Sequence, residues 1–376
     1  MKKILLLLSC IILGTRYMAP NKQTDLIPLP QAYILMECGT QTVLKEHNSN
    51  ERMNAGYLSK LMAILLIAED IENGKYSFES ELTASQSVSE MRGSVVWLEP
   101  GDKMTVDELL KSVIVGNAND ALAVLAERSR GDVESFVKEM NTRAFDFGLR
   151  NTAFYSPYGF FDEREYTTAH DIAFICTKLW EYDFLHPYFK IWRDFVDDEK
   201  VELVNENTLS RTYKRHCGFK ASHSEQSGYC IAECGSSDDG TAFVAVVLGA
   251  ENEELSFGNA KNLINSGFSD YKVTDSYFPD ELIRPVRVKN GVNSAVELGL
   301  REQRDVVVPR GTSMLSMVSV VPDYLTAPLS KGDCVGRAAV YNGKNLVFET
   351  DIIVKNDVKK LTFSFLLRKV LLNITE

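Results

Sequence analysis

One lysine stands at the start of the most apolar helix that the sequence predicts. Lys60 follows Tyr57-Leu58-Ser59 and precedes the run 61–67, where apolar residues occur almost all the way round the helix. That pattern predicts a central, buried helix. A lysine there loses hydration. It can reach an edge or pair with a carboxylate, or its neutral amine can act as a base for a nucleophile one helical turn earlier. The residue three positions before Lys60 is Tyr57, not serine.

Two further polar stretches interrupt apolar segments. Asn117-Ala118-Asn119 separates two apolar helical patterns, and it can be a helix cap and turn or a polar loop that faces inward. Lys220-Ala221-Ser222 lies in the first strand of a predicted hairpin, with strands at 217–222 and 228–232.

The order of the predicted elements indicates an α+β fold. Short strands come first, helices fill the middle and strands return, which favours a helical cluster on a mostly antiparallel sheet. The strands are expected at 32–36, 42–44 and 242–248, and the helices from Lys60 to about 74, from Thr105 to 113, and at 133–147, 171–181 and 256–268.

The character of the chain changes after residue 278. Short strands separated by Gly, Asn and Pro are typical of a small β-sandwich. They are expected at 286–288, 296–298, 305–308, 316–321 and 337–341. We therefore predict a first domain at 28–270, a sandwich domain at 277–358 and a basic, apolar tail at 359–376. Residues Lys359–Asn373 of that tail can lie on a membrane surface or dock on their own domain.

The net charge and the N-terminal segment of the chain limit its possible functions. Lys+Arg 41 against Asp+Glu 52 gives a net charge of −11, so the chain lacks the basic footprint of a nucleic-acid-binding protein. A basic start and a short apolar run predict a signal peptide at 1–19, hence a protein secreted or held at the cell envelope. Leu7-Leu8-Ser9-Cys10 also resembles a lipoprotein cleavage site, with Cys10 lipidated.

The cysteines give no clear metal signal. Six remain after the signal at irregular spacing, and a chain this long needs no disulfide scaffold. Cys230 and Cys234, with His216 and His223, suggest a metal site, but the segment reads as a hairpin without a tight ligand pair. We expect buried thiols there, with no metal and no cofactor.

The three polar stretches, in their order and spacing, resemble the signatures of serine-type D-alanyl-D-alanine carboxypeptidases, the low-molecular-mass penicillin-binding proteins. The resemblance covers nearly the whole chain after the signal and includes flanking stretches such as Asn119-Asp120-Ala121 and Thr167–Asp171. It implies a penicillin-binding, β-lactamase-like transpeptidase fold, with a helical cluster on a five-stranded antiparallel sheet followed by a β-sandwich. It also implies removal of the terminal D-alanine from peptidoglycan stem peptides through an acyl-serine, without a metal.

Four positions depart from that family pattern. Tyr57 stands where the family has its nucleophilic serine, and Asn117 stands where a hydroxyl would help to move the proton. Ala221 replaces a threonine whose hydroxyl would bind the substrate carboxylate, and Ser222 replaces a glycine beside the substrate.

Other features of the pattern are kept or neutral. By the resemblance, Lys60 remains as the base, Asn119 as the group that holds the substrate backbone and Lys220 as the partner of its carboxylate. Tyr158 stands where many members have histidine, a change we treat as neutral. Two other S-x-x-K matches, Ser135–Lys138 and Ser269–Lys272, lack companion motifs and are interpreted as chance.

Three functional hypotheses follow. The first is a catalytically impaired family member at the cell envelope that binds a peptidoglycan stem peptide or an envelope protein. The second is an active D-Ala-D-Ala carboxypeptidase with a rearranged nucleophile, either Ser59 or Tyr57 itself. The third is a structural envelope protein whose cleft binds nothing, with Lys60, Asn119 and Lys220 left as a buried network.

Overall fold

The structure is a computed structural model that describes residues 30–276 and 278–365. The predicted signal peptide at 1–19, which includes Cys10, and residues 366–376 of the predicted tail lie outside the described residues. The chain divides into two compact units, residues 1–265 and 266–376. No helix in the described ranges is long and apolar enough to cross a lipid bilayer.

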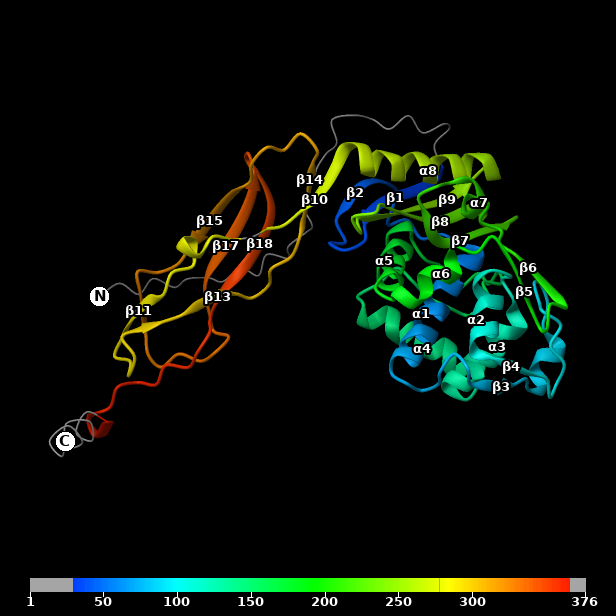
Figure 1. Cartoon of the computed structure of the whole chain (residues 1–376), viewed down its shortest axis with the longest axis horizontal. Coiled ribbons are helices and arrows are strands. Elements are labelled where there is room, and N and C mark those ends of the chain that lie inside the picture. The colour runs from blue at the N-terminus through cyan, green and yellow to red at the C-terminus, as the bar shows by residue number, and fades with distance from the viewer. Residues whose placement is uncertain (1–29, 277, 366–376) are drawn as a thin grey trace. The chain divides into compact units, whose positions relative to one another are not determined.

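The first unit contains the helical cluster and a five-stranded sheet (Figure 1). Its helices are η1 (Gly56–Ser59), α1 (Lys60–Glu72), η2 (Gln86–Glu90), α2 (Val106–Ile114), α3 (Asn119–Arg130), α4 (Val133–Asp146), α5 (Ala169–Trp180), η3 (Asp183–Leu185), α6 (His186–Phe189), α7 (Leu209–Thr212) and α8 (Glu253–Asp270). Its strands are β1 (Ala32–Glu37), β2 (Val43–His47), β3 (Glu81–Thr83), β4 (Lys103–Thr105), β5 (Arg193–Val196), β6 (Val201–Val204), β7 (His216–Ser224), β8 (Gly228–Ser236) and β9 (Ala242–Ala250).

The main sheet has the strand order β2-β1-β9-β8-β7, and all neighbouring pairs are antiparallel. This confirms the predicted five-stranded antiparallel sheet and places β7, which carries Lys220, at an edge. One lateral row of the register runs Lys220, Ala232, Val246 and Ile34. Because the last three belong to the core shared with the helices, the side chain of Lys220 faces the helical layer.

The central helix is α1, as its all-round apolar pattern predicts. Every residue from Lys60 to Ala68 is buried, and α1 lies among the other helices below the sheet in Figure 1. The opposite face of the sheet is covered by α8. Burial on both faces explains the nearly continuous apolar sequence of β9.

Local signals set the start of α2. Thr105 caps it by accepting from the backbone N–H of Glu108, whose carboxylate in turn accepts from the backbone N–H of Thr105. This capping box confirms the predicted N-cap. The helix ends at Ile114, and the loop that contains Asn117 follows it.

The second unit is a β domain around one apolar cluster. Its elements are β10 (Tyr271–Thr274), η4 (Asp280–Leu282), β11 (Val286–Lys289), β12 (Ala295–Val296), β13 (Leu298–Leu300), β14 (Val306–Pro309), β15 (Ser316–Val320), β16 (Tyr324–Thr326), β17 (Cys334–Asn342) and β18 (Asn345–Val354). The strand expected at 296–298 is instead two strands, because Val296 pairs in the sheet β12-β11-β16 and Leu298 in the sheet β13-β18-β17-β15. Both residues still pack in the same cluster.

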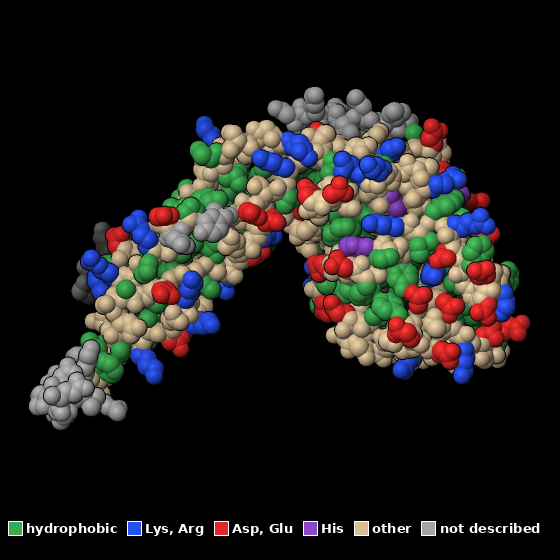
Figure 2. Space-filling model, in the orientation of Figure 1, with side chains coloured by type: hydrophobic (Ala, Val, Ile, Leu, Met, Phe, Trp, Pro, Cys, Tyr) green, Lys and Arg blue, Asp and Glu red, His purple; other side chains and the backbone are tan. Residues whose placement is uncertain are grey.

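Charged side chains of both signs are distributed over the visible surface of the first unit, with acidic ones over its helical end (Figure 2). This distribution agrees with the acidic balance of the sequence. The first residues of the tail pair with their own domain, since Lys360 forms a bridge with Gly291. Phe363, three residues later, is 80% exposed.

Candidate active site

The fold brings the three polar stretches together. Tyr57 lies in η1 and Lys60 begins α1, Asn117 and Asn119 lie where α2 gives way to α3, and Lys220 lies on β7. Direct contacts join them. The ammonium of Lys60 donates to the backbone carbonyl of Asn117, and the hydroxyl of Ser222 accepts from the backbone N–H of Tyr57 at 2.8 Å.

Lys60 is the most deeply buried cation of the site, with 1% of its surface exposed. Burial lowers the pKa of its amine well below the usual value, and the nearby charge of Lys220 lowers it further, while Glu206 and Asp120 act in the opposite direction. A lysine with a depressed pKa can accept a proton from a neighbouring hydroxyl. The environment that a lysine base needs is therefore present.

The residue in position to use that base is Tyr57. Its ring centroid lies 5.2 Å from the Lys60 nitrogen, as expected for residues three apart in a 3₁₀ turn followed by an α-helix. The aromatic ring thus occupies the space beside the amine. A serine at this position would place only a hydroxyl there.

Asn117 acts through two different groups. Its backbone adopts a positive φ of 58°, a conformation that asparagine tolerates better than most residues. The carbonyl accepts from Lys60, while the side-chain amide donates 2.7 Å to Glu206. The side-chain nitrogen is therefore bonded to Glu206, while the Oδ1 is buried and has no hydrogen-bond partner among the described residues.

Asn119 has an unused acceptor. Its side-chain nitrogen donates 2.6 Å to the carbonyl of Arg92, which orients the amide group. Its Oδ1 is buried and has no hydrogen-bond partner among the described residues. A buried acceptor without a donor is costly, so a ligand N–H at this oxygen would relieve a real deficit.

Lys220 is held by the end of α2. Its ammonium donates to the carbonyls of Val113 at 3.1 Å and Ile114 at 3.0 Å, where the helix dipole favours a positive charge. Burial lowers its pKa to about 8, against an opposing effect of Glu206. Two of its three N–H donors are used by these contacts, which leaves one for a ligand.

Ser222 fills space that a smaller residue would leave open. Its hydroxyl would clash with a Cβ at Gly56, whose φ of +54° also favours glycine. With the bond to Tyr57 N–H, this contact fixes Ser222 against the start of η1. Ala221, its neighbour, is also buried and carries no hydroxyl.

Ser59, the alternative nucleophile, makes contacts away from Lys60. Its Oγ lies 2.6 Å from Glu165 Oε1 and 2.8 Å from the carbonyl of Gly56. Glu165 also accepts from the backbone N–H groups of Tyr155 and Ser156. Burial raises the pKa of Glu165, against the lowering effect of these hydrogen bonds. The hydroxyl of Ser59 thus belongs to a buried carboxylate network.

Two site residues were missed by the sequence analysis. Glu206 contacts Asn117 and influences both lysines, and Glu165 holds Ser59. Neither stands in a periodic pattern or near a motif. The only available signal for Glu206 was the polar run Asn205-Glu206-Asn207, which is ordinary in a loop.

Of the remaining candidates, Tyr158 directly precedes Gly159, whose backbone packs against Gly56 and Tyr57, whereas Ser135 and Lys272 lie on other elements. Tyr158 is buried, and its hydroxyl has no partner in the described part of the chain. Ser135 is at the start of α4, and Lys272 of β10 donates to Thr312. Among the described residues, no group of three or more His, Cys, Asp or Glu is arranged to hold a metal.

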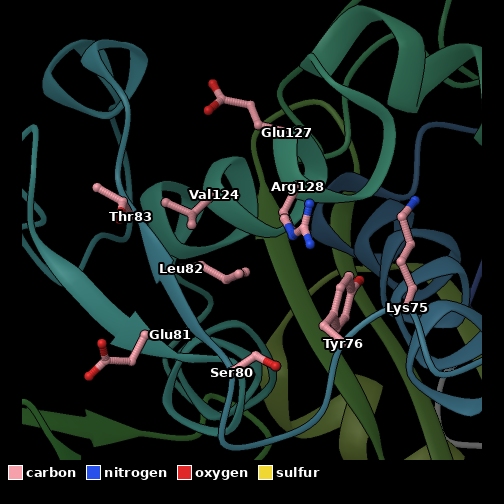
Figure 3. Close-up of a pocket in the computed structure, with 9 residues that line it drawn as sticks. All are labelled: Lys75, Tyr76, Ser80, Glu81, Leu82, Thr83, Val124, Glu127 and Arg128. Carbon is pink, nitrogen blue, oxygen red and sulfur yellow. The ribbon is translucent and has the colours of Figure 1, made fainter.

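A separate pocket of 360 Å³ lies in the helical part, between β3, α3 and the turn after α1 (Figure 3). Charges of both signs surround it. Its lining residues are Lys75, Tyr76, Ser80, Glu81, Leu82, Thr83, Val124, Glu127 and Arg128. Since these include no residue of the three motifs, the pocket is not the candidate active site.

A helical layer on an antiparallel sheet, with one buried lysine at the start of the central helix and another on the edge strand, defines the class of penicillin-binding acyl-transfer proteins. Comparison with known proteins narrows this class. Residues 24–252 match the D-alanyl-D-alanine carboxypeptidase family, and residues 271–360 match the C-terminal domain of penicillin-binding protein 5. The chain therefore belongs to the D-alanyl-D-alanine carboxypeptidase family, which acts in peptidoglycan metabolism.

Individual relatives agree over most of the chain. It is 30% identical to the D-alanyl-D-alanine carboxypeptidase DacF of Bacillus subtilis, covering 93% of this chain and 91% of the relative. It is 29% identical to DacC of Escherichia coli, covering 87% and 84%. The crystal structure of penicillin-binding protein 5 from Haemophilus influenzae superposes with a TM-score of 0.82 at 24% identity, over 91% of this chain and 100% of that one, which supports the fold.

Proposed function

We propose that this chain is a non-hydrolytic member of its family, which binds peptidoglycan stem peptides in the cleft without forming an acyl-enzyme. The observation that carries the proposal is Tyr57. Its ring lies beside the buried amine of Lys60, and its backbone N–H is bonded to Ser222. Loss of the nucleophile in a comparable serine hydrolase costs about 10⁶ in turnover, roughly 8 kcal/mol.

The other changes act in the same direction. Asn117 offers an amide that is bonded to Glu206 in place of a hydroxyl that can relay a proton. Ala221 removes a hydroxyl that would bind the substrate carboxylate, and Ser222 adds a side chain against Gly56. The residues at these four positions thus disfavour hydrolysis, while the surrounding scaffold of the family is kept.

The groups that remain suit a peptide ligand. Asn119 has a free acceptor for a peptide N–H, and Lys220 retains one donor for a terminal carboxylate. Strand β7 lies at the sheet edge, where an extended peptide can add main-chain hydrogen bonds. An envelope protein that presents an extended segment is an alternative ligand for the same groups.

The active-enzyme hypothesis is the second candidate, because the family is hydrolytic. It requires Ser59 or Tyr57 to act as the nucleophile. The contacts of Ser59 with Glu165 and Gly56 and the bulk of the Tyr57 ring count against both. The third hypothesis, a purely structural protein, leaves the free Oδ1 of Asn119 unexplained.

We also propose that the protein works outside the cytoplasm, at the cell envelope, with domain limits at 28–270 and 277–358. The basic and apolar start of the sequence and the peptidoglycan role of the family support this location. Lipidation at Cys10 would anchor the chain. The tail Lys359–Asn373, with Phe363 exposed, would suit peripheral contact with an anionic membrane surface.

The test uses a fluorescent penicillin and the purified protein. We expect no covalent band on a denaturing gel. A band mapped to Tyr57 or Ser59 would establish the active-enzyme hypothesis instead. A thermal melt with a peptide ending in D-Ala-D-Ala then separates binding from a purely structural role, since only a ligand that binds the folded state raises the melting temperature.

A further inference from the structure

Three buried thiols lie together where the main sheet meets the helical layer. The sulfurs of Cys217 on β7 and Cys234 on β8 are 2.8 Å apart, and both side chains are 0% exposed. Cys38, which directly follows β1, forms a side-chain hydrogen bond with Cys234. All three belong to the same apolar cluster.

The strand register explains why two of these sulfurs approach so closely. His216 pairs with Gly235 and Gly218 pairs with Cys234, which leaves Cys217 as the extra residue of a bulge. A bulge re-aims the side chain of the extra residue. Cys217 therefore reaches the face of the sheet on which Cys234 packs, and not the opposite face.

We propose that Cys217 and Cys234 are a disulfide-forming pair, oxidised by thiol–disulfide exchange with a small-molecule or protein disulfide. One thiolate attacks the oxidant's disulfide to give a mixed disulfide, and the second thiolate displaces the oxidant's other sulfur. The balance is two protein thiols and one disulfide giving one protein disulfide and two thiols. A disulfide bond is about 2.05 Å long, so the sulfurs need to approach by only about 0.8 Å.

Three of the remaining described cysteines are placed for other roles. Cys230 donates its thiol to the carbonyl of Ser227, and the exposed Cys334 lies near the carbonyl of Gly336. Cys176 is buried on α5. These three make matched controls, because each is a cysteine of the same chain outside the proposed bond.

A disulfide between Cys217 and Cys234 would restrain one strand of the candidate active site. Cys217 lies three residues before Lys220 on the edge strand β7, so a covalent link to β8 would fix the strand that carries Lys220 and Ser222. The linked residues are 17 positions apart, and a closed loop of that size restricts the unfolded chain. Because both sulfurs are buried, the bond should form as the chain folds and then resist reductants until β7 and β8 separate.

The experiment refolds the full chain from urea in a buffer of reduced and oxidised glutathione. After an acid quench, free thiols are alkylated with N-ethylmaleimide in denaturant and counted by intact mass. We expect two fewer adducts than in the fully reduced protein, and a tryptic cross-link between peptide 216–220 and peptide 221–261. We also expect the oxidised protein to melt at a higher temperature, a difference that dithiothreitol abolishes only when added with denaturant.

Variants assign the partners. Cys230→Ser, Cys176→Ser and Cys334→Ser should keep the loss of two adducts, whereas Cys234→Ser should abolish the 216–220 cross-link. Full alkylation of refolded wild-type protein with native circular dichroism would overturn the proposal. A cross-link from Cys38 to Cys234 in wild-type protein would overturn it equally. If a variant fails to fold, fragmentation of the cross-linked wild-type peptides still distinguishes Cys234 from Cys230, which both lie in peptide 221–261.

Discussion

The hydroxyl of Ser222 accepts a 2.8 Å hydrogen bond from the backbone N–H of Tyr57, a residue 165 positions away. In an acyl-transfer site, the backbone N–H at the nucleophile position points toward the carbonyl that is attacked and stabilises the oxyanion that develops there. Ser222 therefore places its own oxygen where a substrate oxygen would bind. Under the proposed non-hydrolytic function, Ser222 would be a second obstacle to catalysis, in addition to the tyrosine at position 57.

This relationship predicts how activity can be restored. Tyr57→Ser supplies a hydroxyl beside Lys60, and Ser222→Gly frees the N–H. We expect the double variant to react with a fluorescent penicillin about 10²-fold faster than Tyr57→Ser alone, since one oxyanion donor is worth about 10²–10³ in rate. The measurement is the rate of covalent labelling on denaturing gels. The control combines Tyr57→Ser with Ser224→Gly on the same strand, and equal rates for the two double variants would show that Ser222 does not obstruct the site.

A second prediction concerns the pH dependence of stability. Burial lowers the folded-state pKa of Lys60, whereas an unfolded lysine keeps its proton up to about pH 10.4. Between these two pKa values the unfolded state binds more protons, so the free energy of unfolding rises with pH by about 1.4 kcal/mol per unit. The Lys60→Met variant has no ionisable group at this position, so its free energy of unfolding lacks this rise with pH. We therefore expect urea denaturation between pH 7 and pH 10 to show wild type gaining stability relative to Lys60→Met.

The control for this experiment is Lys344→Met, which changes an exposed lysine in the turn between β17 and β18. Its stability should run parallel to that of wild type across the same pH range. A Lys60→Met curve that is also parallel to wild type would mean that Lys60 keeps its proton in the folded protein.

A third prediction separates structure from chemistry at Ser59. Because its hydroxyl contacts Glu165 inside the fold, Ser59→Ala should cost about 1–3 kcal/mol by leaving that carboxylate short of a partner. It should leave penicillin labelling and peptide stabilisation unchanged after correction for stability. Ser135→Ala, at an exposed S-x-x-K match on α4, should change stability by less than about 0.5 kcal/mol. Penicillin labelling of the wild-type protein that disappears in Ser59→Ala would contradict the proposed function and identify Ser59 as the nucleophile.

Local patterns predicted much of the fold. The all-round apolar run after Lys60 predicted α1, and Thr105 predicted the start of α2, where it forms a capping box with Glu108. The polar turn between β7 and β8 predicted the hairpin. The strand β18 was missed although residues 346–354 are rich in β-branched and aromatic residues, which is a strand signal in the sequence. In the structure, Phe348, Thr350, Ile352 and Val354 are buried in alternation.

Other features had no local signal. Strands β5 and β6 form an isolated pair, and the turn between them contains Asp197, Asp198 and Glu199, all at positive φ. Positive φ is uncommon for residues other than glycine, so the sequence of this turn does not predict its conformation. The contacts Ser222–Tyr57 and Glu206–Asn117 join segments far apart in sequence. Only the packed fold sets such contacts, so the motif residues could be predicted but their partners could not.

The last prediction concerns Glu206. This exposed carboxylate interacts electrostatically with Lys60 and Lys220 and raises the pKa of both. A peptide carboxylate at Lys220 would be repelled by it. Glu206→Gln keeps an acceptor for the Asn117 amide and removes the charge. A charge interaction of about 1 kcal/mol near water corresponds to roughly a fivefold change in affinity. We therefore expect a D-Ala-D-Ala peptide with a free carboxylate to bind about fivefold more tightly to the variant at low salt, and less so at high salt.

Two comparisons make this test specific to the cleft. The same peptide with an amidated terminus carries no charge there, so its affinity for Glu206→Gln and for wild type should be equal. Glu202→Gln removes a carboxylate on β6 that pairs with Arg193, and it should not alter either affinity. Isothermal titration calorimetry of both peptides with the three proteins gives the answer. If the amidated peptide gains as much as the free acid, then Glu206 acts on the shape of the loop at Asn117 and not on the ligand's charge, because a purely electrostatic effect needs the carboxylate.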